Sequence, residues 1–302
     1  MDMSLLYTIP HAVPPREAFG LAIAIYFYLT GLSAGSFIIS TLAYGFGMEK
    51  YKPLGKVGVV LATLLLIAAP MFLLLHSGRP LRAWHLFVYL NGTSPISWGS
   101  FLLTLYPINC IIYGFFMFRG NAKLTKIFGL IGIPLAIMVH GYTGFILSFA
   151  KAHALWRTSM MPILFLTSAM VSGVAMMILV TIIKDRFFGK ERKVNTEVVF
   201  GLGKMLLWLL VFDLFLSFSD LSVHYFGEAE SMEAARLLLT GTFAPTFIGV
   251  ETLMGKVVPL VLVANTRTRN VMVYGFAAVL VMVGIFAMRC NVVLGGEFIP
   301  LL

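Results

Sequence analysis

Hydrophobic residues dominate this chain in long runs, and polar residues collect between the runs. Eight runs reach or approach the ~20 residues that a helix needs to cross the ~30 Å hydrocarbon core of a bilayer. This pattern predicts an all-α integral membrane protein of eight transmembrane helices, which returns the chain to the side on which it begins. The runs cover residues 19–45, 57–76, 98–118, 127–149, 160–183, 204–226, 244–264 and 271–290.

Composition and loop lengths support this class. Charged residues make up only 12% of the 302 residues, whereas a soluble domain carries about 25%, and the mean hydropathy is +0.93. The longest connections, 77–97, 184–203 and 227–243, are too short for a soluble domain. We expect one membrane domain over 1–302, with approximate halves 19–149 and 160–290. No cleaved signal peptide is expected, because no basic segment precedes the first run.

A short internal likeness connects the two halves. It either records a duplication or reflects only the small residues that let membrane helices approach closely. The first copy is Leu29-Thr30-Gly31 with Gly35, and the second is Leu166-Thr167-Ser168 with Ser172 and Gly173.

Lysine and arginine are unevenly distributed between the two sides of the predicted bundle. Fourteen lie on the side of the connections that follow the first, third, fifth and seventh runs, and Lys256 lies inside a run. The positive-inside rule assigns the richer side to the cytoplasm. We expect a cytoplasmic membrane protein with both termini extracytoplasmic, and no nucleic-acid partner for its net charge of +9. The poorer side carries Arg16, Arg79, Arg82, Lys151, Arg157, Arg236 and Arg289.

The segment HSGRPLR, residues 76–82, departs from that charge rule. It places two arginines and a histidine directly after a long apolar run, on the side that is otherwise poor in positive charge. Charge in a disfavoured place indicates a function.

Ionisable groups inside the runs are expensive to bury and therefore mark candidate functional positions. Asp213, Ser217, Asp220 and His224 share one helix face and span about 16 Å at 1.5 Å per residue. Such a line suits proton transfer between the outer surface and the interior, and it equally suits ion pairs that hold the bundle together. With His140 and Lys204, it could also extend a path toward the cytoplasm.

Glu251 and Lys256 lie in the seventh run. Residues five apart on an α-helix are about 140° from facing one another, so we expect no obligatory pairing between them. Both remain candidates for proton transfer, together with Asp213, Asp220, His224 and His140.

Few residues are suited to hold a metal. Two cysteines, Cys110 and Cys290, are too few to ligate an iron–sulfur cluster or a cysteine zinc site. A b-type haem needs two histidines on facing helices, and only His76 and His224 lie at similar depth, with His140 deeper. One haem is therefore possible and two are not, and any redox metal must be bound by histidine or by another subunit.

Motifs along nearly the whole chain resemble the NrfD-type membrane subunits of respiratory complexes, a group that includes the membrane subunit of polysulfide reductase. The most specific of them is HSGRPLRAWH with TSPISWG, the second motif in the list that follows. The motifs are YLTGLSAG (28–35); HSGRPLRAWH (76–85) with TSPISWG (93–99); YTG (142–144), Trp156 and PILFLTS (162–168); and Glu251, Gly255, Pro259-Leu260, RCN (289–291) and Gly295-Gly296.

The resemblance implies two four-helix bundles without haem that bind menaquinone or ubiquinone near the extracytoplasmic face. It also implies a partner subunit on that face with several 4Fe-4S clusters, which connects to a catalytic subunit carrying molybdopterin, cytochrome c or another centre. Protons are released or taken up there, and proton translocation is a further hypothesis. The chain is then not active alone.

The resemblance also implies residue roles. Tyr142 is the first expected quinone ligand, and Tyr26 stands where the polysulfide reductase subunit has a histidine. His76, Arg79 and Thr143 complete the expected quinone set, with Arg79 placed to stabilise negative charge on the reduced ring. The expected partner contacts are Arg82, Trp84, His85, Trp156 and Arg157.

Two other classes fit an apolar bundle with a few buried charges. An ion-coupled secondary transporter would use Asp213, Glu251 and Lys256 and would be active as an isolated chain. A haem b-containing membrane anchor would show a strong α-band in a reduced-minus-oxidised spectrum.

Overall fold

A computed structural model describes residues 19–150, 153–188, 194–265, 267 and 269–298 of the protein. Within these ranges eight helical segments are long and apolar enough to cross a membrane, which confirms the eight predicted spans. The spans are α1 (Leu21–Tyr44), η2 (Glu49–Tyr51) with α2 (Lys52–His76), α4 (Pro95–Phe118), α5 (Ala122–Ser148), α6 (Met161–Ile183) with η5 (Lys184–Phe188), α7 (Thr196–Tyr225), η6 (Pro245–Val257) with α9 (Val258–Ala264), and α10 (Val271–Phe298).

Two spans, α7 and α10, extend eight residues beyond the predicted bounds at one end. The α7 helix starts at Thr196, eight residues before the predicted start, because the Asn195 side chain accepts a hydrogen bond from the Val198 N–H at 3.2 Å and caps the helix. The α10 helix runs to Phe298 instead of ending at residue 290, because apolar residues 292–294 continue the helical pattern. Asn291 is consequently inside a span.

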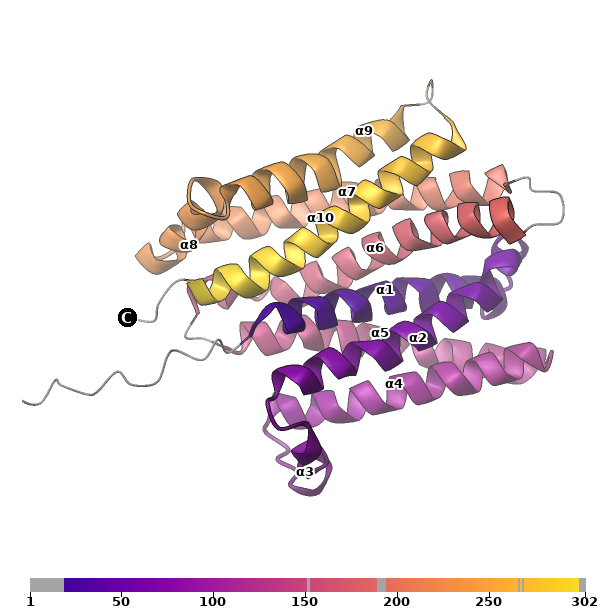
Figure 1. Ribbon diagram of the computed structural model, residues 1–302, viewed down its shortest axis with the longest axis horizontal. Coiled ribbons are helices and arrows are strands. Elements are labelled where there is room, and N and C mark those ends of the chain that lie inside the picture. Colours follow the sequence, from indigo (N-terminus) through magenta and orange to yellow (C-terminus); the bar gives the residue numbers. More distant parts are fainter. Residues whose placement is uncertain (1–18, 151–152, 189–193, 266, 268, 299–302) are drawn as a thin grey trace, which may run out of the picture.

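Four short helices occupy the connections at one end of the bundle. The start of α1 and the end of α10 lie at this same end (Figure 1), where the Phe19 N–H donates to the Glu297 carboxylate. Residues 77–97 and 227–243 are thus partly helical rather than irregular. The short helices are η3 (Pro80–Arg82), α3 (His85–Val88), η4 (Ala154–Trp156) and α8 (Ala229–Leu239).

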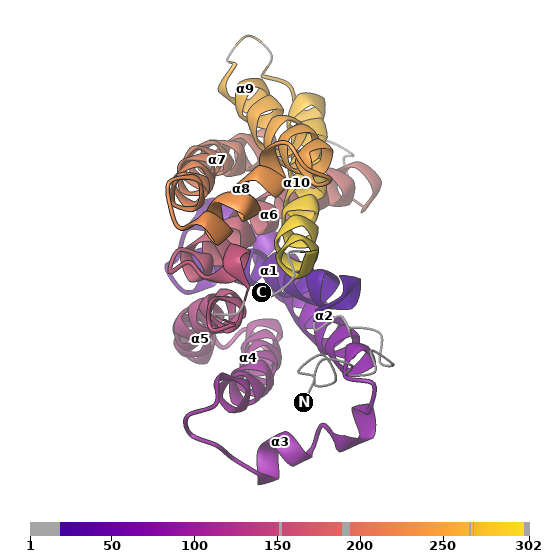
Figure 2. The same ribbon diagram turned by 90° about the vertical axis from the view of Figure 1, so that its left-hand side faces the viewer.

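The α1 and α6 helices run through the middle of the molecule, between α2, α4 and α5 on one side and α7, α9 and α10 on the other (Figure 2). The two central helices cross where Gly35 faces Gly173, so the repeated small residues of the two halves meet each other. A second glycine contact, between Gly255 and Gly284, joins η6 to α10. Small residues at both crossings permit close backbone approach.

Replacing Gly35 by alanine is expected to destabilise the protein by about 1–3 kcal/mol, as overpacking does. The new Cβ would overlap the Gly173 Cα, so α1 and α6 would have to separate. Gly141→Ala in α5 is the matched control, because its Cβ would meet nothing within 4 Å. Denaturation in SDS followed by circular dichroism measures both variants. Equal stability of the two would contradict the close crossing.

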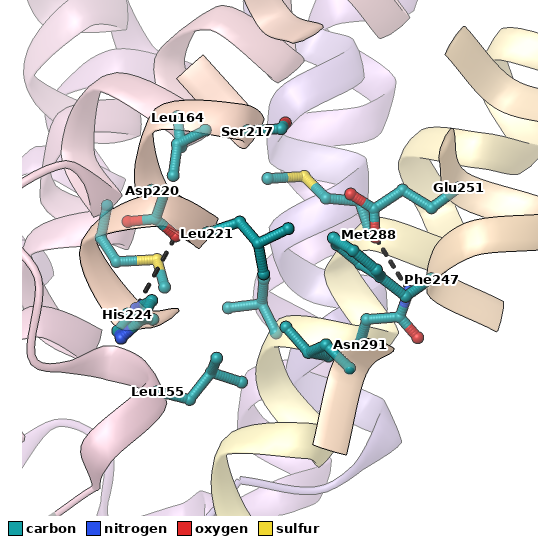
Figure 3. Close-up of a pocket in the computed structure, with 13 residues that line it drawn as sticks. Leu155, Leu164, Ser217, Asp220, Leu221, His224, Phe247, Glu251, Met288 and Asn291 are labelled. Carbon is teal, nitrogen blue, oxygen red and sulfur yellow. Dashed lines mark hydrogen bonds and ion pairs between the residues drawn. The ribbon is translucent and has the colours of Figure 1, made fainter. Parts of the chain in front are cut away.

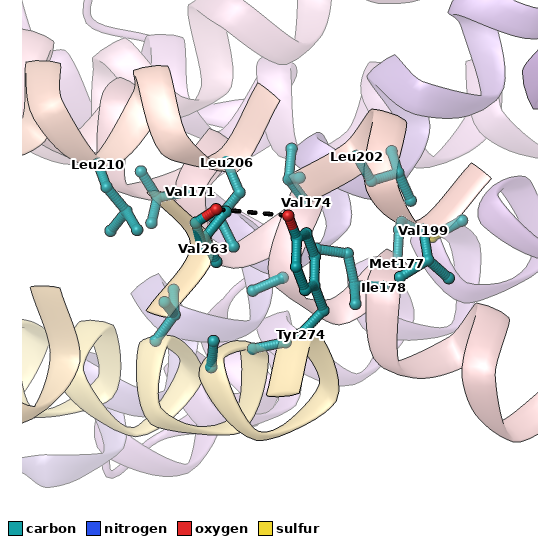
Figure 4. Close-up of a cluster of buried hydrophobic side chains, with 14 of the residues drawn as sticks. Val171, Val174, Met177, Ile178, Val199, Leu202, Leu206, Leu210, Val263 and Tyr274 are labelled. Atoms are coloured by element: carbon teal, nitrogen blue, oxygen red, sulfur yellow. Dashed lines mark hydrogen bonds between the residues drawn. The ribbon is translucent and has the colours of Figure 1, made fainter. Parts of the chain in front are cut away.

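An apolar cluster fills the end of the second half that faces the basic connections (Figure 4). The α6 helix contributes Val171 and Val174, and α7 contributes Leu202, Leu206 and Leu210, all fully buried. Tyr274 turns its hydroxyl to the Val263 carbonyl at 3.3 Å, so it adds no free polar group. This cluster begins one helical turn from Asp213 on α7 and gives that side of the buried charges an apolar lining.

Candidate functional site: a buried charge cluster beside a small cavity

Lys256 is the centre of a buried ionic cluster between α7 and η6. Its side chain is fully buried, and its Nζ lies 3.0 Å from Asp213 Oδ2 and 3.2 Å from Glu251 Oε1. The same ammonium donates to Ser217 Oγ at 2.7 Å. Two carboxylates and one ammonium are thus held inside the bundle, an arrangement that is stable only while the opposite charges stay paired.

The α-helical spacing did not require Glu251 and Lys256 to pair, and the structure shows that they do. The η6 segment is a π-helix over Pro245–Val257, in which backbone hydrogen bonds join residues five apart. This wider winding places residues 251 and 256 on the same face. Such π segments are frequent at functional sites.

A chain of polar contacts extends from Glu251 to α10. Asn291 Nδ2 donates to Glu251 Oε2 at 2.8 Å, and Thr246 Oγ1 donates to Asn291 Oδ1 at 2.8 Å. Both carboxylate oxygens of Glu251 are therefore occupied, one by Lys256 and one by Asn291. Sequence reasoning quoted Asn291 only as part of the RCN motif, because it placed the end of the helix at residue 290.

Asp220 and His224 form a second polar group on α7, nearer the end that holds α8. His224 Nε2 lies 3.8 Å from Asp220 Oδ2, and Thr158 Oγ1 donates to Asp220 Oδ1 at 2.9 Å. His224 is only 3% exposed. The structure thus confirms that the four polar residues of α7 share one face, and it adds Thr158, which sequence reasoning missed.

A cavity of about 40 Å³ connects the two polar groups (Figure 3). Ser217 and Glu251 line it on one side and Asp220 and His224 on the other, while Leu164, Met288 and Leu221 supply apolar walls. This volume admits a few water molecules, whereas the ring of a quinone is much larger. The cavity can therefore bridge carboxylates through water but cannot hold a quinone.

Arg289 on α10 is buried at 1% exposure, which corrects its assignment to the charge of the outer side. Its Nη2 donates to Ser168 Oγ at 2.7 Å and to the Phe165 carbonyl at 3.1 Å, and the guanidinium lies 3.8 Å from the Phe165 ring centroid. Its Nε and Nη1 have no hydrogen-bond partner among the described residues. Asp213 and Glu251 are paired with Lys256 and not with Arg289.

Tyr26 and Tyr142 form a separate site in the first half of the molecule. Tyr26 lies on α1 and Tyr142 on the neighbouring α5, and the Tyr142 ring packs directly against Gly99 of α4. Tyr26 is 3% exposed, and its hydroxyl has no hydrogen-bond partner in the described part of the chain. A buried hydroxyl in that state is costly, and a ligand carbonyl at this position would satisfy it.

His140 and Thr143 are held by backbone in the same region. His140 Nε2 lies 2.6 Å from the Thr30 carbonyl of α1, and its Nδ1 lies 2.7 Å from the Ala136 carbonyl. The Thr143 hydroxyl donates to the His140 carbonyl at 2.7 Å. Both side chains therefore tie α5 to its neighbours and to itself, and neither directs a free donor toward Tyr26.

The two histidines considered as a haem-binding pair, His76 and His224, do not face each other. His76 and His224 belong to α2 and α7, which lie on opposite sides of α1 and α6 (Figure 2), so the predicted possibility that they face each other is wrong. Within the described part of the chain no three His, Cys, Asp or Glu side chains converge as metal ligands would.

The expected partner contacts fall into two groups. Arg79 and Arg82 are exposed, as are Trp84 at 57% and Leu81 at 89%, on a connection that projects beyond the ends of α2 and α4 (Figure 1). His85 is half-buried and packs against Trp84 with ring centroids 4.0 Å apart. His76 closes α2 just before this connection.

Trp156 and Arg157 differ from that exposed group. Trp156 is fully buried and donates to the Val292 carbonyl at 2.7 Å, so the predicted partner contact is wrong and the ring belongs to the core. Arg157 pairs with the carboxylate of Glu228 and lies 3.8 Å from Glu230. Arg16, Lys151, Lys190, Arg192 and Lys193, which entered the charge count, lie outside the described residues.

Eight membrane-length helices, a buried ionic cluster and short connections without a soluble domain define a multi-pass helical membrane protein. Residues 12–300 match the family described as polysulphide reductase, NrfD. The chain belongs to this family, as its motifs indicated.

Three relatives illustrate the range of the family. The chain is 28% identical to the C subunit of selenate reductase from Mesobacillus selenatarsenatis, over 96% of this chain and 76% of the relative. It is 29% identical to the Hdr-like menaquinol oxidoreductase integral membrane subunit of Archaeoglobus fulgidus, over 94% and 72%. It is also 29% identical to the C subunit of polysulfide reductase from Wolinella succinogenes, over 91% and 93%.

Proposed function

We propose that this chain is the quinone-reactive membrane subunit of a respiratory oxidoreductase complex. The observation that carries the proposal is the buried Tyr26 hydroxyl of α1, which lacks a partner among the described residues. Tyr142 belongs to the neighbouring helix α5, and its ring packs against Gly99 of α4. Two phenols supply the donors that quinone carbonyls accept. Two relatives are named for this chemistry, the menaquinol oxidoreductase subunit of Archaeoglobus fulgidus and a menaquinone reductase subunit of Nitratidesulfovibrio vulgaris.

The quinone, menaquinone or ubiquinone, would carry two electrons and two protons per reaction cycle, and this chain would bind and orient it. Tyr26 and Tyr142 donate to its oxygens, with Thr143, His76 and Arg79 in the surrounding shell. Electrons pass to or from a partner subunit with 4Fe-4S clusters, which connects to a catalytic subunit. A haem is not part of this proposal.

The partner docks on the end of the bundle that carries α3 and α8. Exposed apolar side chains such as Leu81 and Trp84 stand there beside Arg79 and Arg82, and exposed apolar groups beside charge are typical of interaction surfaces. The opposite end holds the basic connections after α1, α4 and α6. The positive-inside rule therefore supports an extracytoplasmic position for the docking end and for both termini.

The buried charge cluster is proposed to exchange protons with the extracytoplasmic face. Water in the cavity would connect Glu251 to Asp220 and His224, which lie toward that face. Asp213 and Lys256 set the charge at the inner end of this path. Translocation to the cytoplasm would need a hydrated opening through the apolar cluster around Leu206 and Leu210, so we place proton exchange on the outer side only.

Asp213→Asn is expected to slow proton exchange linked to quinol turnover, because it removes one of the two negative charges that hold Lys256. The complete complex is reconstituted in liposomes with a pH-sensitive dye on each side, and electron transfer and proton movement are measured together. Asp185→Asn is the matched control, because this half-buried carboxylate lies near the basic connections and, among the described residues, accepts only a backbone N–H, from Asn195. Unchanged turnover and proton exchange in Asp213→Asn would contradict the relay. Absence of quinol-dependent electron transfer in the unaltered complex would contradict the proposed function.

A further inference from the structure

A groove of about 280 Å³ lies between α2 and α4 on the surface that faces lipid. Its rims are the exposed side chains of Leu64, Ile111 and Phe115. Gly114 forms part of its floor, and a Cβ added at Gly114 would lie 3.5 Å from the Val59 side chain. The groove thus remains open because a glycine, and not a larger residue, faces α2.

Two cations stand at the mouth of this groove, at the end of the bundle with the basic connections. Lys56 Nζ lies 5.6 Å from the ring centroid of Phe118, and the Arg119 guanidinium lies 4.6 Å from that of Phe115. Both rings line the groove. Both cations are exposed, and among the described residues no carboxylate lies within ion-pair distance of either. Their charge is available to a ligand.

The inner groove offers no polar group to a ligand among its lining residues. Two of the lining residues carry a polar side-chain atom, and neither presents it to the groove. The Thr63 hydroxyl donates to the Val59 carbonyl of the same helix at 2.8 Å. Cys110, the other, is fully buried. A ligand that fits must therefore be apolar along the groove and anionic at the mouth. A quinone ring, which needs hydrogen-bond donors for its carbonyls, finds none in this lining.

We propose that this groove is a binding site for an anionic phospholipid of the leaflet next to the basic connections. One acyl chain lies between α2 and α4, and the phosphate meets Lys56 and Arg119. From Phe118 to Cys110 the groove runs about 12 Å at 1.5 Å per residue, which accommodates the upper part of an acyl chain. Basic pockets between membrane helices are suited to anionic headgroups.

Native mass spectrometry of the full purified chain tests the site directly. The chain is titrated with phosphatidylglycerol, cardiolipin or phosphatidylcholine of identical acyl chains. We expect phosphatidylglycerol to bind about thirtyfold more tightly than phosphatidylcholine, because each of the two cations near the headgroup contributes about 1 kcal/mol. Lys56→Ala with Arg119→Ala is expected to remove this preference. The control double variant Lys123→Ala with Lys126→Ala loses the same charge at the same end and is expected to retain it.

Gly114→Leu tests the acyl chain separately from the headgroup. It is expected to weaken binding of all three lipids and to leave the charge preference of any residual binding intact. Gel filtration checks its folding, and Gly114→Ala takes its place if it does not fold. Equal binding of anionic and zwitterionic lipids by the unaltered chain would overturn the proposal. So would equal loss in the two double variants, or displacement of phosphatidylglycerol by an equal concentration of menaquinone.

Discussion

Lys256→Met is expected to be the most destabilising single substitution in the second half, at about 3–5 kcal/mol. The substitution leaves Asp213 and Glu251 buried without their shared cation, and breaking one side of a buried ion pair costs this much because an uncompensated charge remains. The measurement is SDS-induced unfolding followed by circular dichroism, with the yield of folded protein as a second readout. The remaining hydrogen bond of Glu251, from Asn291, cannot replace an ammonium.

Two comparisons separate this electrostatic effect from lost packing. Lys204→Met, an exposed lysine of the same α7 helix as Asp213, is expected to change stability by less than about 0.5 kcal/mol. The double variant Lys256→Met with Asp213→Asn is expected to be less destabilised than the sum of its single variants, because one of the orphaned charges is removed. Additive effects would show that the pair at 3.0 Å carries no coupling.

Tyr26→Phe is expected to lower quinol-dependent turnover about tenfold at limiting quinol while leaving the protein as stable as before or more so. One lost hydrogen bond to the ligand corresponds to about 1.4 kcal/mol. Removing the Tyr26 hydroxyl breaks no hydrogen bond within the protein, since it has no partner among the described residues. Tyr142→Phe is expected to impair turnover in the same way and to spare assembly with the partner. Steady-state kinetics of the reconstituted complex measures both.

Tyr113→Phe is the control for a buried phenol in the same half. Its hydroxyl lies 3.1 Å from Ser40 Oγ, so its loss is expected to reduce stability and to leave the KM for quinol unchanged. The opposite directions of the Tyr26 and Tyr113 variants distinguish a ligand-binding hydroxyl from a structural one. Normal turnover in both Tyr26→Phe and Tyr142→Phe would place the quinone elsewhere.

The polar face of α7 could be predicted because it depends only on helical periodicity. Residues spaced by four, three and four repeat at 3.6 per turn whatever surrounds them. The same periodicity did not predict the contact between Glu251 and Lys256, since π-winding of η6 changes the angular step. The local sequence gives a single hint of that winding, which is the five-residue separation between two opposite charges.

Burial relative to the rest of the bundle was the second source of error. Trp156 stands in a connection between spans, where aromatic residues commonly meet a partner, yet the end of α10 covers it completely. Arg289 was counted with the outer charges because its span was expected to end at the next residue. The longer α10 carries it inward to Ser168 and Phe165.

Local sequence patterns suffice to predict the class of protein, the number of spans, the family and the residues with ionisable groups in the membrane. These properties follow from local hydrophobicity and composition, because hydrocarbon permits only helices that satisfy their own backbone. Helix packing was needed to establish which charges meet, how large the cavity between them is, and that the Tyr26 hydroxyl remains without a partner among the described residues. Those features depend on the crossing of α1 with α6 and on the winding of η6, which are set by contacts between residues distant in the chain.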